Sequence, residues 1–475
     1  MVFTSLTFLV FAALFFPAFF LTRGRFQSLI TLVASYVFYG WWDWRFMALL
    51  AVSTVGDYTI GRLLARTEAA GTRRLMLTVS IAANLSYLGF FKYFNFFASS
   101  MAALLHGIGL EADWATLHIV LPVGISFYTF QSMSYTIDVY YRRLAPERDF
   151  LIFATFIALF PQLVAGPIVR ARWLLPQLHR TRRFRWANLF VGLEMIITGF
   201  FLKLVVADNI SPFVTLNFQL PEAYNSLSLL LAVILFAFQI YGDFAGYSLI
   251  AIGLARIIGY KFPANFRRPY LSRSFSEFWT RWHISLSSWL RDYLYIPLGG
   301  NRHGKARTHR NLLATMLLGG LWHGANWTFI GWGALHGCYL VGQRLLGDSA
   351  RRVPIRLPVP RAAAYLVQVL AVFTLVSVAW VFFRAPSFSE AVIVLRRVLL
   401  LDDWHTTDLP LKFHLVKALA LVVLLVAIEI GAEHSTIRNT YFRSRAARTG
   451  GMLALLWLIP LAGSFAGAQF IYFQF

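Results

Sequence analysis

Two histidines stand where acid–base chemistry could occur in this chain. His283 lies in a tryptophan-rich stretch, and His323 lies within residues 312–342, which contain no Asp, Glu, Lys or Arg. Histidine can take up and return a proton near neutral pH, and an ionisable residue inside an apolar membrane segment is a candidate for function. The alternative for each is a neutral imidazole that is bonded to a nearby carbonyl.

The stretch around His283 predicts one amphipathic helix over residues 274–296. Ser274 and Glu277 have the spacing of a capping box, and Glu277 precedes Arg281 by one helical turn. Apolar residues recur at three- and four-residue spacing: Phe275, Phe278, Trp279, Trp282, Leu286, Trp289, Leu290 and Tyr293. A tryptophan-rich face opposite arginine is typical of the membrane interface, and the basic flanks predict its cytoplasmic side.

The stretch around His323 predicts two helices that meet in a break. Glycines interrupt the charge-free segment at 319, 320, 324, 331, 333 and 337. Irregular backbone at membrane depth requires protein or a wet cavity around it, so we expect His323 near such a break. His336 follows His323 by thirteen residues. It would face another direction on a continuing helix, which favours a structural role.

The composition indicates an all-α, polytopic membrane protein. Of the 475 residues, 58% are hydrophobic and 13% are charged, whereas soluble proteins carry about 25% charged residues. We expect a single transmembrane domain over 1–475 with about 11–12 crossings, in which the apolar run 2–21 is a retained span. The net charge of +22 indicates basic cytoplasmic loops against anionic lipid, not nucleic-acid binding. Because Cys338 is the only cysteine, we expect no intramolecular disulfide and no cysteine-based metal site.

Two further segments have unusual patterns. Residues 150–168 are apolar but have basic residues on both sides, and they contain Pro161, Gly166 and Pro167, so we expect a re-entrant segment. The alternative is an ordinary span that breaks the charge rule. Gln239 and Asp243 share one helical face inside an apolar span. A buried aspartate needs a partner, and the sequence offers three candidates without choosing among them: His283, Arg281 and Arg267.

Several stretches together resemble a known family. The segments RWHISLSSWLRDYLYIPLGGNR (281–302) and GGLWHGANWTFIGWGALHG (319–337) are similar to the signature of the membrane-bound O-acyltransferase (MBOAT) superfamily. SYVFYGWWDWRF, LPVGISFYTFQSMSYTIDVYY, FPQLVAGPIVR, YGDFAGYSLIAIGLA and VAWVFFRA extend the likeness over about 30–385. The set resembles the bacterial polysaccharide O-acetylation branch, which includes the membrane subunit of alginate O-acetylation. Leu249 departs from that branch, where an acid is expected.

The resemblance implies a fold, a reaction and partners. It implies a ring of helices around a thinned centre in the bacterial inner membrane, with His323 as the catalytic histidine and His283 as the second. The donor would be acetyl-CoA, with no bound cofactor or metal, and the acetyl group would pass to an exopolysaccharide directly or through an extracytoplasmic acetyltransferase. Candidate supporting residues are Asp243, Gln239, Trp282, Arg281, Trp322 and Asn326.

Three other functions remain open from the sequence. Within the same family, a D-alanyl transferase of teichoic acid modification would use a carrier-protein donor instead. A passive transporter or flippase, or a non-catalytic scaffold of a polymer-export complex, would need no chemistry at His323. The acyltransferase hypothesis therefore predicts that the protein loses its activity when His323 is replaced. The transporter and scaffold hypotheses do not predict this loss.

Overall fold

The computed structural model describes residues 1–110, 117, 119–164, 166–352, 360–401, 403–404, 409–465 and 470–471. Regular structure in these ranges is helical throughout, without a strand, which confirms the all-α prediction. Contacts group the chain into two compact units. Unit 1 comprises Met1–Ile196 and Ile250–Pro263, and unit 2 comprises Ile197–Leu249 and Ala264–Phe475.

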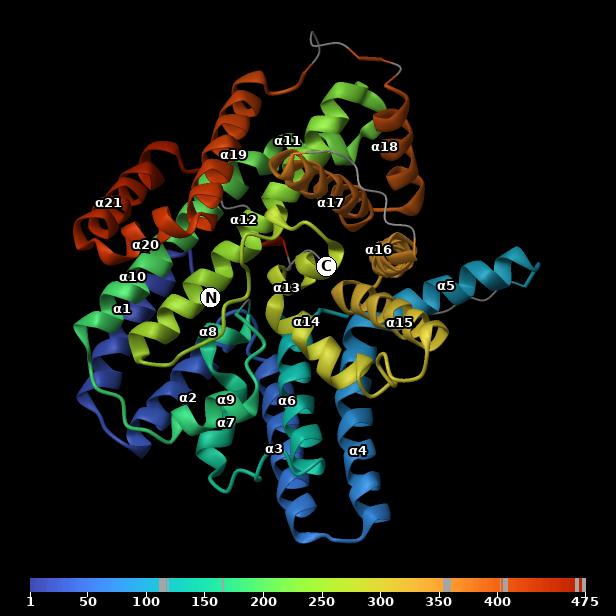
Figure 1. Cartoon of the computed structure of the whole chain (residues 1–475). Helices are drawn as coiled ribbons and strands as arrows, with labels where there is room; N and C mark the ends of the chain where they lie inside the picture. The colour runs from blue at the N-terminus through green and yellow to red at the C-terminus, as the bar shows by residue number, and fades with distance from the viewer. Residues whose placement is uncertain are drawn as a thin grey trace. The chain divides into compact units, whose positions relative to one another are not determined.

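Unit 1 is made of the N-terminal helices (Figure 1). They are α1 (Leu6–Leu21), α2 (Arg25–Gly40), α3 (Phe46–Arg66), α4 (Ala70–Leu88), η1 (Gly89–Tyr93), α5 (Phe94–Gly107), α6 (Ile125–Tyr140), α7 (Phe150–Ala158), α8 (Phe160–Leu163), α9 (Ala171–Leu178) and the first part of α10 (Trp186–Phe200). Side-chain caps begin several of them. Ser5 accepts the Phe8 N–H at the start of α1, and Asp149 accepts the Leu151 N–H at the start of α7.

The segment predicted to be re-entrant folds as two short helices. α7 ends at Ala158 and α8 begins at Phe160, because Pro161 lacks the N–H that a continuing helix would need. Both helices are largely buried, and the Phe160 ring packs among Phe8, Phe11, Phe15 and Phe38. Neither helix is long enough to span a bilayer alone, so re-entry stays the prediction for this segment.

Unit 1 also encloses a polar cluster around Asp57 of α3. Its carboxylate accepts the Ser80 hydroxyl at 2.6 Å and the Asn84 amide at 2.8 Å, both from α4. The Ser132 hydroxyl of α6 donates to the same carboxylate. These donors satisfy the oxygens of a buried carboxyl group, which would otherwise be costly to bury, so this cluster links three helices.

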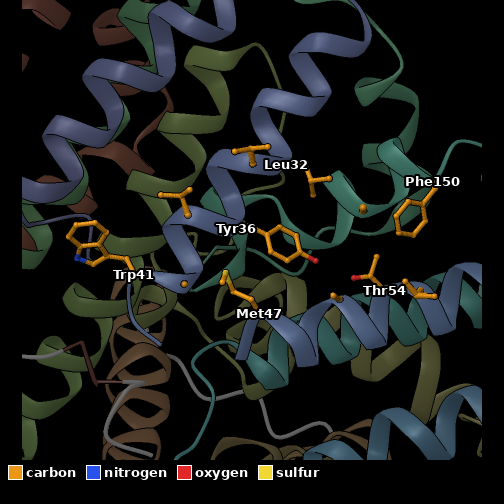
Figure 2. Close-up of a pocket in the computed structure, with 12 residues that line it drawn as sticks. Leu32, Tyr36, Trp41, Met47, Thr54 and Phe150 are labelled. Carbon is orange, nitrogen blue, oxygen red and sulfur yellow. The ribbon is translucent and has the colours of Figure 1, made fainter. Parts of the chain in front are cut away.

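An apolar pocket of about 760 Å³ lies among α2, α3 and α7 (Figure 2). Its walls include Leu32, Met47 and Phe150, and Tyr36 and Thr54 supply its only side-chain hydroxyls. Figure 2 shows the Tyr36 ring reaching between α2 and α3. The walls carry neither histidine nor carboxylate, so acid–base chemistry has to be sought elsewhere.

Unit 2 contains the remaining elements (Figure 1). They are η2 (Phe201–Ala207), α11 (Asp208–Gln219), η3 (Pro221–Ala223), most of α12 (Ser226–Ile258), η4 (Pro269–Leu271), α13 (Phe275–Arg281), α14 (Ile284–Leu290), η5 (Arg291–Tyr295), α15 (Lys305–His323), α16 (Trp327–Arg352), α17 (Arg361–Arg384), α18 (Phe388–Leu400), α19 (Lys412–Glu433), α20 (Ser435–Arg443) and α21 (Arg445–Ala462).

Two glycines let α15 and α16 pack closely. A Cβ on Gly320 would lie 2.2 Å from the Phe329 carbonyl oxygen, and one on Gly333 would lie 2.4 Å from that of Met316. Neither position has room for a side chain, so the two backbones approach as small residues allow in membrane helix pairs. This contact fixes the end of α15, where His323 lies.

Five helical stretches of the described chain are long and apolar enough to cross a membrane. They are Ala70–Gly107, Trp186–Gln219, Ser226–Ile258, Ala362–Arg384 and Lys412–Glu433. This is the pattern of a multi-pass membrane protein. The total of about 11–12 crossings and the MBOAT-type ring stay predictions.

Candidate active site

The prediction of one helix over 274–296 is wrong, because the helix breaks at His283. α13 ends at Arg281, and His283 adopts the left-handed conformation (φ 40°, ψ 55°) before α14 begins. This conformation is strained for a residue with a Cβ, and strain of this kind clusters at functional sites. The turn directs the His283 side chain into unit 2, where it is fully buried.

The predicted start of α13 is confirmed. Ser274 Oγ accepts the Glu277 N–H at 3.1 Å, and the Glu277 carboxylate accepts the Arg273 N–H at 2.9 Å. Arg281 pairs with Glu277 at 2.7 Å and with Glu433 of α19 at 3.0 Å. Arg281 thus links α13 to α19 through ion pairs and has a structural role.

The apolar residues that recur at helical spacing in residues 275–293 pack partly inside unit 2. Phe278, Trp282 and Leu286 are buried within unit 2, and the Trp282 ring lies 4.9 Å from that of Trp380 on α17. Burying large aromatic rings contributes strongly to packing. Trp282 is therefore part of the core, and the location at the cytoplasmic interface stays a prediction.

His323 is the last residue of α15, and the predicted break follows it directly. The chain is extended at Gly324 (φ −161°) before α16 begins at Trp327. Asn326 shapes this connection, because its Oδ1 accepts the Thr328 N–H at 3.0 Å and its Nδ2 donates to the Pro386 carbonyl at 3.0 Å. The prediction of two helices meeting beside His323 is confirmed.

The fold brings the two histidines together. The His283 and His323 ring centroids are 6.5 Å apart. Trp322 borders both rings, 6.0 Å from His283 and 5.0 Å from His323. Trp332 of α16 and Phe383 of α17 lie 5.0 and 5.3 Å from His323. Aromatic carbon therefore surrounds the pair, and this environment disfavours a charged imidazolium.

Asn265 orients the His283 ring. Its Oδ1 lies 3.2 Å from His283 Nδ1 and also accepts the Ser285 hydroxyl at 2.9 Å. Its Nδ2 donates to the Ser248 hydroxyl of α12 at 3.0 Å. Burial lowers the pKa of His283 to about 3, because desolvation penalises the charged form. His283 is therefore a neutral, fixed imidazole at physiological pH.

His336 lies behind the pair on α16. It is fully buried, and its ring lies 4.7 Å from Trp332, 5.0 Å from Trp279 and 5.9 Å from Phe278. No group in the described part of the chain bonds to either of its ring nitrogens. The Trp332 ring therefore contacts both His323, at 5.0 Å, and His336, at 4.7 Å.

A pocket of about 270 Å³ opens beside this aromatic group. Its walls combine apolar residues with hydroxyl and basic groups. They are Trp279, Thr280, Ile284, Ser287, Ser288, Leu290, Arg291, Tyr295, Leu312, Thr315, Met316 and Leu340. Trp279 belongs to this wall and lies 5.7 Å from Trp332. Ring contacts through Trp279 and Trp332 thus connect the pocket wall to His323.

Asp243 has a partner that the sequence analysis missed. None of His283, Arg281 and Arg267 pairs with it; Lys203 Nζ lies 2.7 Å from Asp243 Oδ1 and 2.8 Å from Asp208 Oδ1. All three charged side chains are at least nine-tenths buried. The available signal was Lys203 itself, a lone cation inside an apolar span. Gln239, one turn earlier, has no partner for its Oε1 among the described residues.

Comparisons with known proteins extend this picture. Residues 141–385 match the MBOAT, membrane-bound O-acyltransferase, family. The chain is 43% identical over 448 residues to a probable alginate O-acetylase AlgI of Azotobacter vinelandii, covering 93% of this chain and 86% of the relative. It is 35% identical over 397 residues to a peptidoglycan O-acetyltransferase of Helicobacter pylori, covering 78% and 73%. A teichoic acid D-alanyltransferase of Bacillus subtilis matches at 28% over 228 residues, covering 46% and 58%.

The matched range contains both histidines and most of their surroundings. His283, His323 and Asn265 fall inside residues 141–385, as do the tryptophans that connect the small pocket to His323. More than half of the chain matches the family, and the 43% identity extends over nearly all of it. The chain belongs to the membrane-bound O-acyltransferase family.

Proposed function

We propose that this protein is an inner-membrane O-acetyltransferase that moves an acetyl group from a cytosolic thioester towards an exported polysaccharide. The supporting observation is the burial of His283 and His323 side by side, with ring centroids 6.5 Å apart. The named functions of the relatives favour O-acetylation of an alginate or peptidoglycan polymer over D-alanyl transfer, because the D-alanyltransferase match is shorter and weaker.

In the proposed reaction, His323 acts as the general base. It takes the proton of the acceptor hydroxyl while that oxygen attacks the thioester carbonyl carbon. The new C–O bond forms, the C–S bond breaks, and the imidazolium returns its proton to the departing thiolate. A neutral imidazole is the form that this step needs, and the aromatic surroundings of His323 favour it.

His283 would assist by orientation. Its ring is held through Asn265, and it is neutral because burial lowers its pKa to about 3. Asn265 Oδ1 can only accept, so the single proton of the neutral ring lies on Nδ1 and leaves Nε2 as an acceptor. His283 would therefore orient the donor or the acceptor hydroxyl through Nε2. It would not carry the transferred proton.

The small pocket is the proposed entry for the donor, which we propose is acetyl-CoA. Arg291 and the hydroxyls of Ser287 and Ser288 offer polar contacts to a pantetheine arm or phosphate, and Leu312 and Met316 offer apolar ones. Movement of Trp279 would open the route to Trp332 and His323. An extracytoplasmic acetyltransferase would then accept the acetyl group for the polymer, unless the polymer receives it directly.

Replacing His323 tests this function. His323→Ala should abolish detectable polymer acetylation in a deletion strain, since general-base catalysis contributes on the order of 100- to 10,000-fold. Membrane levels should stay normal, and the exposed His303 provides the matched control as His303→Ala. Near-normal acetylation by a normally accumulating His323→Ala protein would eliminate the mechanism and favour a transporter or scaffold.

A further inference from the structure

Asp243, Phe244 and Tyr247 lie within two turns of α12, and each contacts a segment far away in the sequence. The Ile471 N–H donates to Asp243 Oδ2 at 2.6 Å. The Phe470 ring lies 4.3 Å from the Tyr247 ring and 6.0 Å from the Phe244 ring. Phe470 and Ile471 are both buried. Phe470 and Ile471 therefore lie in the core of unit 2.

The local backbone makes this docking possible. Gly242 and Gly246 have the small-xxx-small spacing, and a Cβ on Gly246 would lie 2.7 Å from the Gly199 carbonyl oxygen. This close approach brings Lys203, on the π-helical η2, within 2.7 Å of Asp243. π-Helical segments frequently occur at functional sites.

Two further hydrogen bonds hold described residues that precede Phe470 in the sequence. The Ser464 N–H donates to the Leu204 carbonyl of η2 at 2.9 Å. Asn209 Nδ2 donates to the Ala462 carbonyl at 2.9 Å. Together with the Ile471–Asp243 bond, they join Ser464, Ala462 and Ile471 to η2, α11 and α12, respectively.

The same contacts lead to the histidine pair. The Phe244 ring stands perpendicular to the His283 ring, with centroids 4.7 Å apart. Phe244 also packs 5.0 Å from Phe266, which lies 5.1 Å from Trp282, the residue before His283. A shift of Phe244 would therefore move the surface against which His283 is held.

We propose that Phe470 and Ile471 form a positioning element of the active site: the Ile471–Asp243 hydrogen bond and the Phe470 ring hold Phe244 against His283. Asp243 is then a positioning residue and touches no substrate. Asp243, paired with Lys203, also presents a carboxylate oxygen to the Ile471 N–H, and charge assistance strengthens that bond. The role in catalysis rests on the function proposed above, whereas the docking itself does not.

Two aspartates provide a matched test, because each gives Lys203 one carboxylate. Asp243→Leu and Asp208→Leu both remove one carboxylate from Lys203, but of the two described carboxylates only that of Asp243 accepts the Ile471 N–H. Asp243→Leu should lower kcat for acetyl transfer by up to about 100-fold, the cost of a misplacement of roughly 1 Å. Asp208→Leu should have the smaller effect. Equal losses in the two variants would overturn the proposal.

A second variant, Phe470→Ala, tests the positioning proposal without changing any charge. It should lower kcat similarly while membrane accumulation stays normal, and Phe470→Leu, which restores apolar volume, should recover much of the loss. A direct readout is diethylpyrocarbonate modification of the full-length protein, followed peptide by peptide. His283 should react faster in Phe470→Ala than in the parent, while His336 stays protected as in the parent.

The results of these experiments distinguish a failure of the positioning proposal from a failure of the proposed acetyltransferase function. Unchanged His283 labelling together with a normal rate in Phe470→Ala would refute the positioning role. Parallel exposure of His283 and His336 would show a general loss of packing and would refute it as well. Retained activity in His323→Ala would instead refute the proposed function, and the labelling result would still stand on its own.

Discussion

Of the two pockets described above, the larger has the poorer chemistry. The pocket of unit 1 measures about 760 Å³, but apart from the hydroxyls of Tyr36 and Thr54 its lining side chains are apolar. The pocket of unit 2 measures about 270 Å³, and it is lined by hydroxyls, Arg291 and Trp279. Trp279 leads through Trp332 towards His323.

The difference shows that volume is a poor guide to the reactive centre in a membrane protein. Apolar walls fit any hydrocarbon, whereas a reaction needs a few fixed polar groups that converge on one point. Unit 1 uses its buried carboxylate, Asp57, to join helices through neutral donors. Unit 2 places the imidazoles of His283 and His323 beside Trp322, where we propose that His323 exchanges a proton.

The largest predicted effect concerns the helix pair that carries His323. Gly333→Ala places a Cβ 2.4 Å from the Met316 carbonyl oxygen, so α15 and α16 must separate. A displacement of roughly 1 Å at His323 would lower the acetylation rate about 100-fold. Polymer acetyl content in a complemented deletion strain measures the effect.

Gly342→Ala is the matched control on the same helix. A Cβ there has no neighbour within 4 Å, and alanine favours a helix over glycine by about 1 kcal/mol. Activity should stay at the parental level. Equal rates for Gly333→Ala and the parent would show that the close approach of α15 and α16 does not position His323.

The next prediction concerns two substitutions, each of which narrows one of the two pockets. Ser288→Phe narrows the pocket of unit 2 and should raise KM for the acyl donor roughly tenfold or more, as expected when contacts in a binding pocket are disturbed. Ala51→Phe narrows the pocket of unit 1 and should leave KM unchanged. Initial rates at graded donor concentration measure both. The reverse pattern would reassign the donor to unit 1.

The sequence predicted the helix break beside His323, the cap at Ser274 and the pairing of Glu277 with Arg281, because each depends on residues close in the chain. It missed the break at His283. The helical period of apolar residues continues across this residue, and only tertiary packing makes the left-handed turn favourable. It also missed Lys203 as the partner of Asp243, since no local pattern joins residues 40 positions apart.

The last prediction has the smallest effect and concerns the charge state of His283. Its pKa falls from 6.5 to about 3 on folding, so the unfolded chain binds one more proton than the folded chain between those values. The contribution of this buried neutral group to the free energy of unfolding is therefore complete above about pH 6.5. It is lost as the pH falls, by at most about 1.4 kcal/mol per pH unit for one proton.

The variant His283→Asn tests this contribution. Asparagine suits the left-handed backbone and cannot titrate, so the unfolding temperature of the variant in detergent should depend less on pH than that of the parent. His323, the titratable group that faces His283, remains in both proteins, and His303→Asn at an exposed site should keep the parental slope. If His283→Asn also kept that slope, protonation of His283 would not contribute to acid destabilisation, and the buried neutral imidazole would have to be abandoned.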